Sequence, residues 1–155
     1  MRRVRVRQAA GALLLIAGVI QLIRPTRPAP GASEYGTMTS HIATPPDVEA
    51  LLVGACYDCH SAQTEWPWYS WIAPFSWWIV EDVRHARSNL DFSDWSTDPN
   101  REPTPTQRLR WSCEEVRENV MPPLPYRLMH PEARLTRGEK DLLCDWVADA
   151  LAELR

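Results

Sequence analysis

Two cysteines and a histidine stand together at residues 56–60, in the order Cys56-Tyr-Asp-Cys59-His60. Sulfur and imidazole groups at this spacing could bind a metal ion, form a thiol–disulfide couple, or attach a haem covalently and ligate its iron. These three chemistries differ in the other residues that they need, so the rest of the chain can distinguish them.

Zinc binding and thiol–disulfide exchange both need features that are hard to find in this chain. A structural zinc site has four ligands, usually from two close pairs, but Cys113 and Cys144 are far from the first pair and from each other. A thioredoxin-like couple follows a strand in a βαβ pattern, and no segment here alternates convincingly with period two. A zinc or thiol-redox module is therefore the weaker hypothesis.

Haem attachment agrees with the spacing, because C-x-x-C-H is the sequence signature of c-type haem. Two thiols on adjacent turns can reach the two vinyl groups on one porphyrin edge, and the next residue can point its imidazole at the iron. We therefore expect one covalently attached haem c, with thioethers at Cys56 and Cys59 and with His60 as the proximal iron ligand. Covalent attachment suits a small domain, which cannot bury enough surface to hold haem reliably.

A low-spin electron-transfer haem needs a second axial ligand, usually Met or His. Met121 is the predicted distal ligand, because it ends a predicted helix and is followed by two prolines. A packing role for Met121 is the alternative, and Met129, His85 and His130 are competing ligands. If Met121 does not bind, an open sixth position would indicate a haem enzyme or sensor for peroxide or a small gas.

The N-terminal residues have the pattern of an export signal or a membrane anchor. Residues 1–8 are basic, and residues 9–23 are apolar with only Gln21 clearly polar. No convincing small-x-small cleavage site follows, so we expect an uncleaved membrane anchor helix, with the basic tail in the cytoplasm and the main domain exported. A cleaved signal peptide is the alternative. Residues 24–46 are proline-rich without an apolar period and are interpreted as a tether.

The remaining residues, 47–155, are predicted to form a small all-α domain with long, ordered, proline-marked loops. Apolar residues recur with helical spacing before Cys56, which predicts one helix there. Pro74 can begin the next helix. Thr104 and Thr136 each begin a capping box. The four predicted helices span 47–57, 75 to about 89, 104 to about 120, and 136 toward the C-terminus.

The charge and composition of the chain exclude several classes of function. The net charge of the 155 residues is −3, and from Ala43 onward 19 acidic residues stand against 11 Arg and Lys. An acidic body is unsuited to nucleic acid and suited to a basic patch on a partner. We find no Ser-His-Asp set, phosphate loop or carboxylate pair, so an electron carrier is expected rather than a catalyst.

Cys113 and Cys144 lie outside the C-x-x-C-H motif and could form a disulfide in an oxidising compartment. Closing a loop of about 30 residues would stabilise the fold by roughly 3–4 kcal/mol in the chain-entropy account. Two buried free thiols are the alternative.

Further segments make the sequence resemble the bacterial haem-binding domain family over about residues 48–150. Besides C-x-x-C-H, the segments that carry the resemblance are Trp66-Pro-Trp-Tyr-Ser70, Ala73-Pro-Phe-Ser-Trp-Trp78, Leu90-Asp-Phe-Ser-Asp-Trp95, Met121-Pro-Pro123, His130-Pro-Glu-Ala-Arg-Leu135 and Leu143-Cys-Asp-Trp146. The resemblance implies a cytochrome c-like, single-haem protein that is tethered to the bacterial inner membrane or exported to the periplasm. It also implies Cys56 and Cys59 as attachment sites, His60 as proximal ligand and Met121 as distal ligand, with an unknown redox partner.

Two positions depart from the pattern that the family leads us to expect. Asn119 and Val120 stand where a glycine is expected shortly before the distal methionine, and Glu81 and Asp82 stand where a histidine is common.

Arg127, which lies beside Tyr126 and near Met121 in the sequence, is a candidate partner for a haem propionate.

Overall fold

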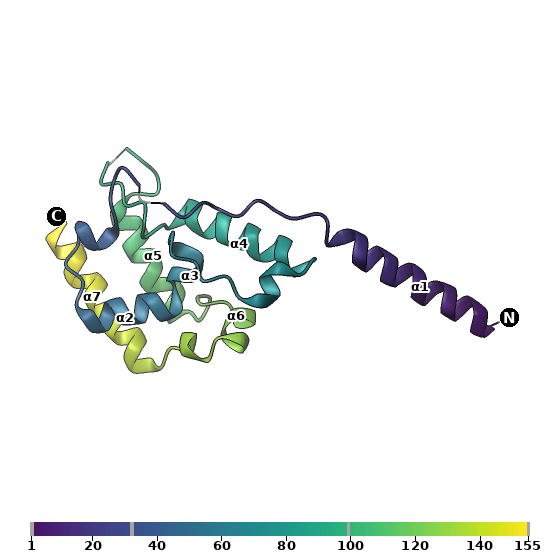
Figure 1. Cartoon of the computed structure of the whole chain (residues 1–155). Coiled ribbons are helices and arrows are strands. Elements are labelled where there is room, and N and C mark those ends of the chain that lie inside the picture. Colours follow the sequence, from purple (N-terminus) through teal and green to yellow (C-terminus); the bar gives the residue numbers. More distant parts are fainter. Residues whose placement is uncertain (1, 32, 99, 155) are drawn as a thin grey trace.

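The computed structural model describes residues 2–31, 33–98 and 100–154, and within them every regular element is a helix (Figure 1). The predicted all-α class is therefore confirmed. The elements are α1 (Arg2–Ile20), η1 (Met38–Ser40), α2 (Pro46–Ala55), α3 (Tyr57–His60), η2 (Trp68–Trp71), α4 (Phe75–Asn89), α5 (Pro105–Arg117), α6 (Leu124–Met129), η3 (Pro131–Ala133) and α7 (Arg137–Glu153), where η denotes a 3-10 helix. Figure 1 shows α2 to α7 gathered in one body, from which α1 projects on the side away from the C-terminus.

The two capping boxes that the sequence predicts are present. Thr104 accepts a hydrogen bond from the backbone N–H of Gln107 and begins α5. Thr136 does the same with Glu139 at the start of α7. Each box satisfies backbone donors that a helix start otherwise leaves unpaired, which is why these two helices begin where the sequence indicates.

The core lies where α2, α5 and α7 pack against one another. Its largest fully buried side chains are Trp95, Met38, Leu52, Leu109 and Leu143. Burying each aliphatic side chain of this size stabilises the fold by roughly 1.5–3 kcal/mol. A disulfide between Cys113 and Cys144 joins α5 to α7 across a sequence separation of 31 residues.

The predicted membrane anchor is wrong. No helix in the described part of the chain is long and apolar enough to cross a membrane. The first helix starts at Arg2 and ends at Ile20, so its apolar part is only residues 9–20, about 18 Å against the ~30 Å of a hydrocarbon core. Beyond the helix, the side chain of Gln21 donates to the carbonyl of Ala73 (3.1 Å) and accepts from its N–H (2.9 Å).

The segment predicted as a tether lies along the body. Arg27 stacks on the rings of Trp66 and Trp71, at 4.3 and 3.3 Å from the ring centroids. Farther along, Met38 is fully buried, and its N–H donates to the carbonyl of Phe92 (2.8 Å). The segment makes these contacts through single residues rather than through one face of a helix. Its sequence therefore shows no apolar periodicity.

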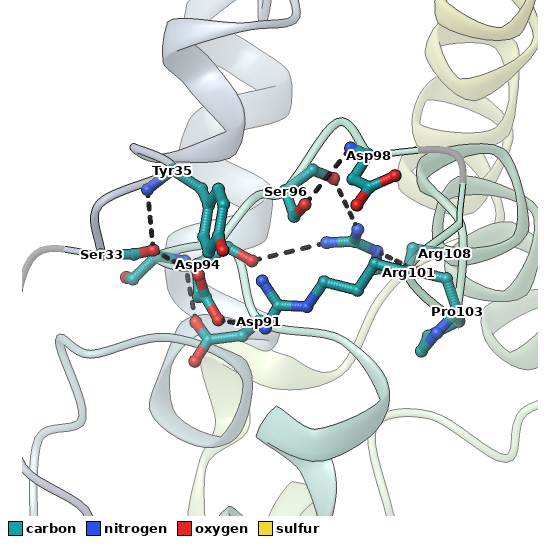
Figure 2. A network of polar contacts seen from close by, with 10 residues as sticks. Ser33, Tyr35, Asp91, Asp94, Ser96, Asp98, Arg101, Pro103 and Arg108 are labelled. Atoms are coloured by element: carbon teal, nitrogen blue, oxygen red, sulfur yellow. Dashed lines mark hydrogen bonds and ion pairs between the residues drawn. The ribbon is translucent and has the colours of Figure 1, made fainter.

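A polar network joins the loop before α5 to the segment around Ser33 (Figure 2). Arg108 is only 5% exposed, and it donates to the carbonyls of Pro103 (3.0 Å), Asp94 (3.4 Å) and Ser96 (2.7 Å). Its guanidinium also lies 4.5 Å from the ring centroid of Trp95. All three types of guanidinium nitrogen are therefore satisfied by the polypeptide itself.

Candidate functional site

The C-x-x-C-H motif forms a tight turn between two helices. The N–H of Cys56 donates to the carbonyl of Leu52 (2.8 Å) and ends α2, and the N–H of His60 donates to the carbonyl of Cys56 (2.9 Å) within α3. The predicted helix over 47–57 is thus interrupted at Cys56, whose φ is −124°. The interruption places both cysteines and the histidine on one turn.

The two cysteine sulfurs are half-buried and are not joined to each other. Burial raises the pKa of Cys56 to about 12 and that of Cys59 to about 11; at Cys59 the charges of Asp58 and Asp82 act in the same direction and that of Arg87 opposes them. Thiols with raised pKa values are slow in thiol–disulfide exchange at neutral pH, because the thiolate is the reactive form. Nor do residues 2–31, 33–98 and 100–154 contain a group of three or more His, Cys, Asp or Glu that could hold a metal ion.

His60 is held in one orientation by its backbone surroundings. Its Nδ1 donates to the carbonyl of Leu90 (2.9 Å), and the ring of Phe92 meets it edge-on at 6.4 Å between centroids. Burial lowers the pKa of His60, so the imidazole is neutral. With the proton on Nδ1, the lone pair of the ring is on Nε2. This is the tautomer in which histidine ligates iron.

Helix α4 packs against α3 and brings Arg87 beside the motif. Arg87 donates to Thr64 Oγ1 (2.8 Å) and to the carbonyl of Ala29 (3.3 Å), while its buried Nε has no partner within the described chain. Burial lowers the pKa of Arg87, and the charges of Asp91 and Cys59 oppose this shift. A buried guanidinium N–H without an acceptor is costly unless another group supplies one.

The loop that carries Met121 begins at the end of α5. Asn119 has φ 62°, the left-handed conformation, and the N–H of Val120 donates back to the carbonyl of Glu115 (2.9 Å). This hydrogen-bond pattern ends helices that usually have glycine at the left-handed position, and asparagine is among the residues that tolerate it best. The missing glycine therefore does not change the backbone, and Met121 follows as a half-buried side chain packed against the core.

The competing ligands are placed differently. Met129 is 56% exposed on α6, and His85 is exposed on α4. His130 uses both ring nitrogens, Nε2 with the hydroxyl of Tyr69 (2.9 Å) and Nδ1 with the carboxylate of Glu132 (3.1 Å). In this arrangement only Met121 is a half-buried side chain without a competing hydrogen bond of its own.

Large apolar side chains on the elements around the motif are uncovered. Helix α6 buries none of its residues. The exposed apolar side chains on α6, η2 and α4 include Leu124, Leu128, Trp68, Trp71, Phe75 and Trp78. A cavity of about 110 Å³ lies elsewhere, between residues 21–27 and residues 70–76, and is smaller than the ~300–1,000 Å³ of ordinary ligand sites.

These features fit a haem better than the other two chemistries. The site offers two unbonded sulfurs and an imidazole that is oriented through Nδ1, with its lone pair on Nε2. Buried Nε atoms of Arg87 and Arg127 lack acceptors in the part of the chain that is described, and haem propionates are acceptors. The uncovered apolar side chains give a porphyrin surface to contact. The pairing of Arg127 with a propionate remains a prediction.

Comparison with known families agrees with the residues of the site. The model of a family described as the haem-binding domain matches residues 15–149, and the chain therefore belongs to this family. It is a haem-binding protein, as its resemblance to that family predicts. No curated protein and no solved structure matches the chain. The cytochrome c-like build, the covalent attachment and the domain boundaries stay predictions.

The sequence did not predict the roles of three residues in or near the motif, which are Asp58, Tyr126 and Tyr69. Asp58, between the two cysteines, accepts a hydrogen bond from Tyr126 (2.7 Å), and Tyr69 bonds His130. Burial first, and then the hydrogen bond to Asp58, raises the pKa of Tyr126. The only signal in the sequence was a polar residue inside the motif, and its partner lies 68 residues away.

Proposed function

We propose that this haem-binding protein carries one haem c, bound through thioethers at Cys56 and Cys59, and transfers single electrons. The observation that carries the proposal is the hydrogen bond from Nδ1 of His60 to Leu90, which orients the imidazole and leaves its lone pair on Nε2, directly after the second cysteine. An iron ligand needs such an oriented imidazole, whereas a thiol–disulfide couple does not.

The residues of the site have distinct tasks. When bound, the haem supplies an iron that exchanges one electron between its ferric and ferrous forms. Cys56 and Cys59 would hold the haem through thioethers, and the carbonyl of Leu90 orients the imidazole of His60. The carbonyl of Leu90 also makes the imidazole a stronger donor, which is one way that a protein adjusts an iron's potential.

We propose Met121 as the second axial ligand. The support is its half-buried position at the end of a left-handed turn, compared with the exposed Met129 and His85 and the fully bonded His130. A methionine ligand gives a higher potential than a second histidine would. The axial pair would be His60 and Met121.

The disulfide supports a site of action outside the cytoplasm. Disulfides form and persist in oxidising compartments such as the bacterial periplasm, where we propose that the protein works. The excess of acidic residues from Ala43 onward supports docking to a basic patch on a redox partner. The rate of electron transfer to that partner is then expected to fall as salt concentration rises.

Expression of the full chain in bacteria competent for c-type haem maturation tests this function. We expect a coloured protein whose haem stays with the polypeptide on a denaturing gel. We also expect a low-spin ferric spectrum with a methionine–iron band that Met121→Ala abolishes and Met129→Ala preserves. A colourless protein would overturn the proposed function. A low-spin spectrum unchanged in Met121→Ala would overturn the assignment of the distal ligand and leave haem attachment standing.

A further inference from the structure

Helix α6 (Leu124–Met129) has no buried side chain of its own, although Met121 and Pro122 before it pack inward. The helix has six residues. Helices this short are unstable alone, because too few hydrogen bonds form to offset the cost of starting a helix. Contacts with other parts of the chain must therefore decide where this segment lies.

One such contact reaches into the C-x-x-C-H turn. The hydroxyl of Tyr126 donates to Oδ2 of Asp58 (2.7 Å), and the N–H of Glu65 donates to Oδ1 (2.9 Å). The same carboxylate thus joins α6, the motif and the loop that follows the motif. A hydrogen bond to an ionised carboxylate is stronger than a neutral one, and this one is half-buried.

A second contact lies at the other end of the segment. The hydroxyl of Tyr69, on η2, and Nε2 of His130 are 2.9 Å apart. The ring of His130 is stacked on that of Tyr126, with 4.1 Å between centroids and 11° between planes. The two contacts are therefore coupled, since Tyr126 and His130 support each other within one turn of chain.

We propose that Asp58, Tyr126, His130 and Tyr69 form a latch that holds residues 121–130 across the haem motif and thereby positions Met121 for the iron. The inference rests on the proposed function, in which Met121 is the sixth ligand. Two attachments hold Met121 in place. On its N-terminal side its own N–H donates to the carbonyl of Glu115 (3.1 Å), and on its C-terminal side is the latch. The four latch residues are positioning residues, because they act on the iron only through Met121.

Conservative variants that remove a single hydroxyl test the latch. Tyr126→Phe and Tyr69→Phe each keep the ring and lose one hydrogen bond. Tyr35→Phe is the matched control, because Tyr35 is a 43% exposed tyrosine outside the latch. For each haem-loaded protein, the measurements are the methionine–iron band of the ferric form, the affinity for added imidazole, and hydrogen exchange over residues 121–130.

We expect Tyr126→Phe to bind imidazole about ten-fold more tightly than wild type, the factor that corresponds to 1.4 kcal/mol of lost loop stabilisation. The methionine–iron band should weaken, and exchange should rise in residues 121–130 but not in α7. Tyr69→Phe should shift each quantity in the same direction by a smaller factor, and Tyr35→Phe should match wild type.

Two results would overturn the latch, and they are distinguishable. Wild-type imidazole affinity in both Tyr126→Phe and Tyr69→Phe, with Met121→Ala still losing its band, would show that Met121 is held without the latch. A spectrum unaffected by Met121→Ala would remove the ligand that the latch positions, and with it both the latch and the distal assignment. If Tyr126→Phe yields no folded protein, Tyr69→Phe decides the question by the same readouts.

Discussion

The region around Arg108 and the region around the haem motif each contain an arginine with a buried guanidinium nitrogen, but only in the first does the polypeptide supply every acceptor. Arg108 donates to three backbone carbonyls (Figure 2), and its guanidinium also stacks on Trp95. Arg87, beside Cys59, leaves its buried Nε without an acceptor in the described chain. A polar group that is buried and unpaired costs free energy, so such a group indicates a site where a ligand could supply the missing acceptor.

The apolar side chains differ between the two regions in the same way. Near Arg108, the ring of Trp95 is buried and lies nearly parallel to that of Phe92, 6.4 Å apart with 4° between planes, and Phe92 extends this buried stack as far as His60. Near the haem motif, Phe75 and Trp78 on α4 are more than half exposed. The difference shows that the core and the loop network bury their own apolar and polar groups. The region of the motif instead leaves apolar side chains exposed, and these are suited to contact a flat apolar group.

The largest expected effect is the loss of covalent haem when both motif cysteines are replaced. Cys56→Ser combined with Cys59→Ser removes both sulfurs that could form thioethers, so we expect no haem on a denaturing gel. The matched control is Cys113→Ser with Cys144→Ser, which removes two cysteines outside the motif and should keep the stain. Retention of the stain in the motif variant would contradict the proposed attachment.

The control variant has a large effect of its own, on stability. Removing the disulfide frees a loop of 31 residues in the unfolded chain, and this should lower the free energy of unfolding by roughly 3–4 kcal/mol. Urea unfolding with and without the disulfide measures the difference. A change below about 1 kcal/mol would show that the α5–α7 contact, rather than the bond, holds these helices together.

The two arginines give the sharpest form of the comparison. Arg108→Met leaves one buried and two partly buried carbonyls without a charged donor, and we expect it to destabilise the fold by roughly 3 kcal/mol. Arg87→Met loses only the bonds to Thr64 and Ala29, so about 1 kcal/mol is expected. Equal losses in urea unfolding would mean that the two regions do not differ as we argue.

The smallest expected effect is a dependence of stability on pH that comes from Asp94. Burial alone would raise its pKa, but hydrogen bonds from Ser33 and Arg101 outweigh burial and lower it. A lowered pKa in the folded state gives stabilisation that is present above the unfolded value of about 4 and is lost as pH falls through the folded value. Asp94→Asn should therefore lose less stability than wild type between about pH 5 and 2. Parallel curves for the two proteins would contradict this.

Local signals in the sequence predicted a large part of the fold. Capping boxes at Thr104 and Thr136 mark helix starts that depend on residues three positions apart, and both are present. The anchor failed because a hydrophobic run shows how many residues are apolar but not which of them are helical. The helix ends at Ile20, and the next residue, Gln21, bonds Ala73, 52 positions away.

In the site, too, local features could be predicted from the sequence and long-range contacts could not. Two cysteines and a histidine within five residues limit the motif to a few chemistries by themselves, because one helical turn brings the three side chains together. The tertiary structure alone decided that Leu90 would orient His60, that Arg87 would lie beside Cys59 with an unpaired Nε, and that Tyr126 would reach Asp58. Such contacts join residues about 30 to 70 positions apart, and their geometry follows from how the helices pack rather than from any local pattern of residues.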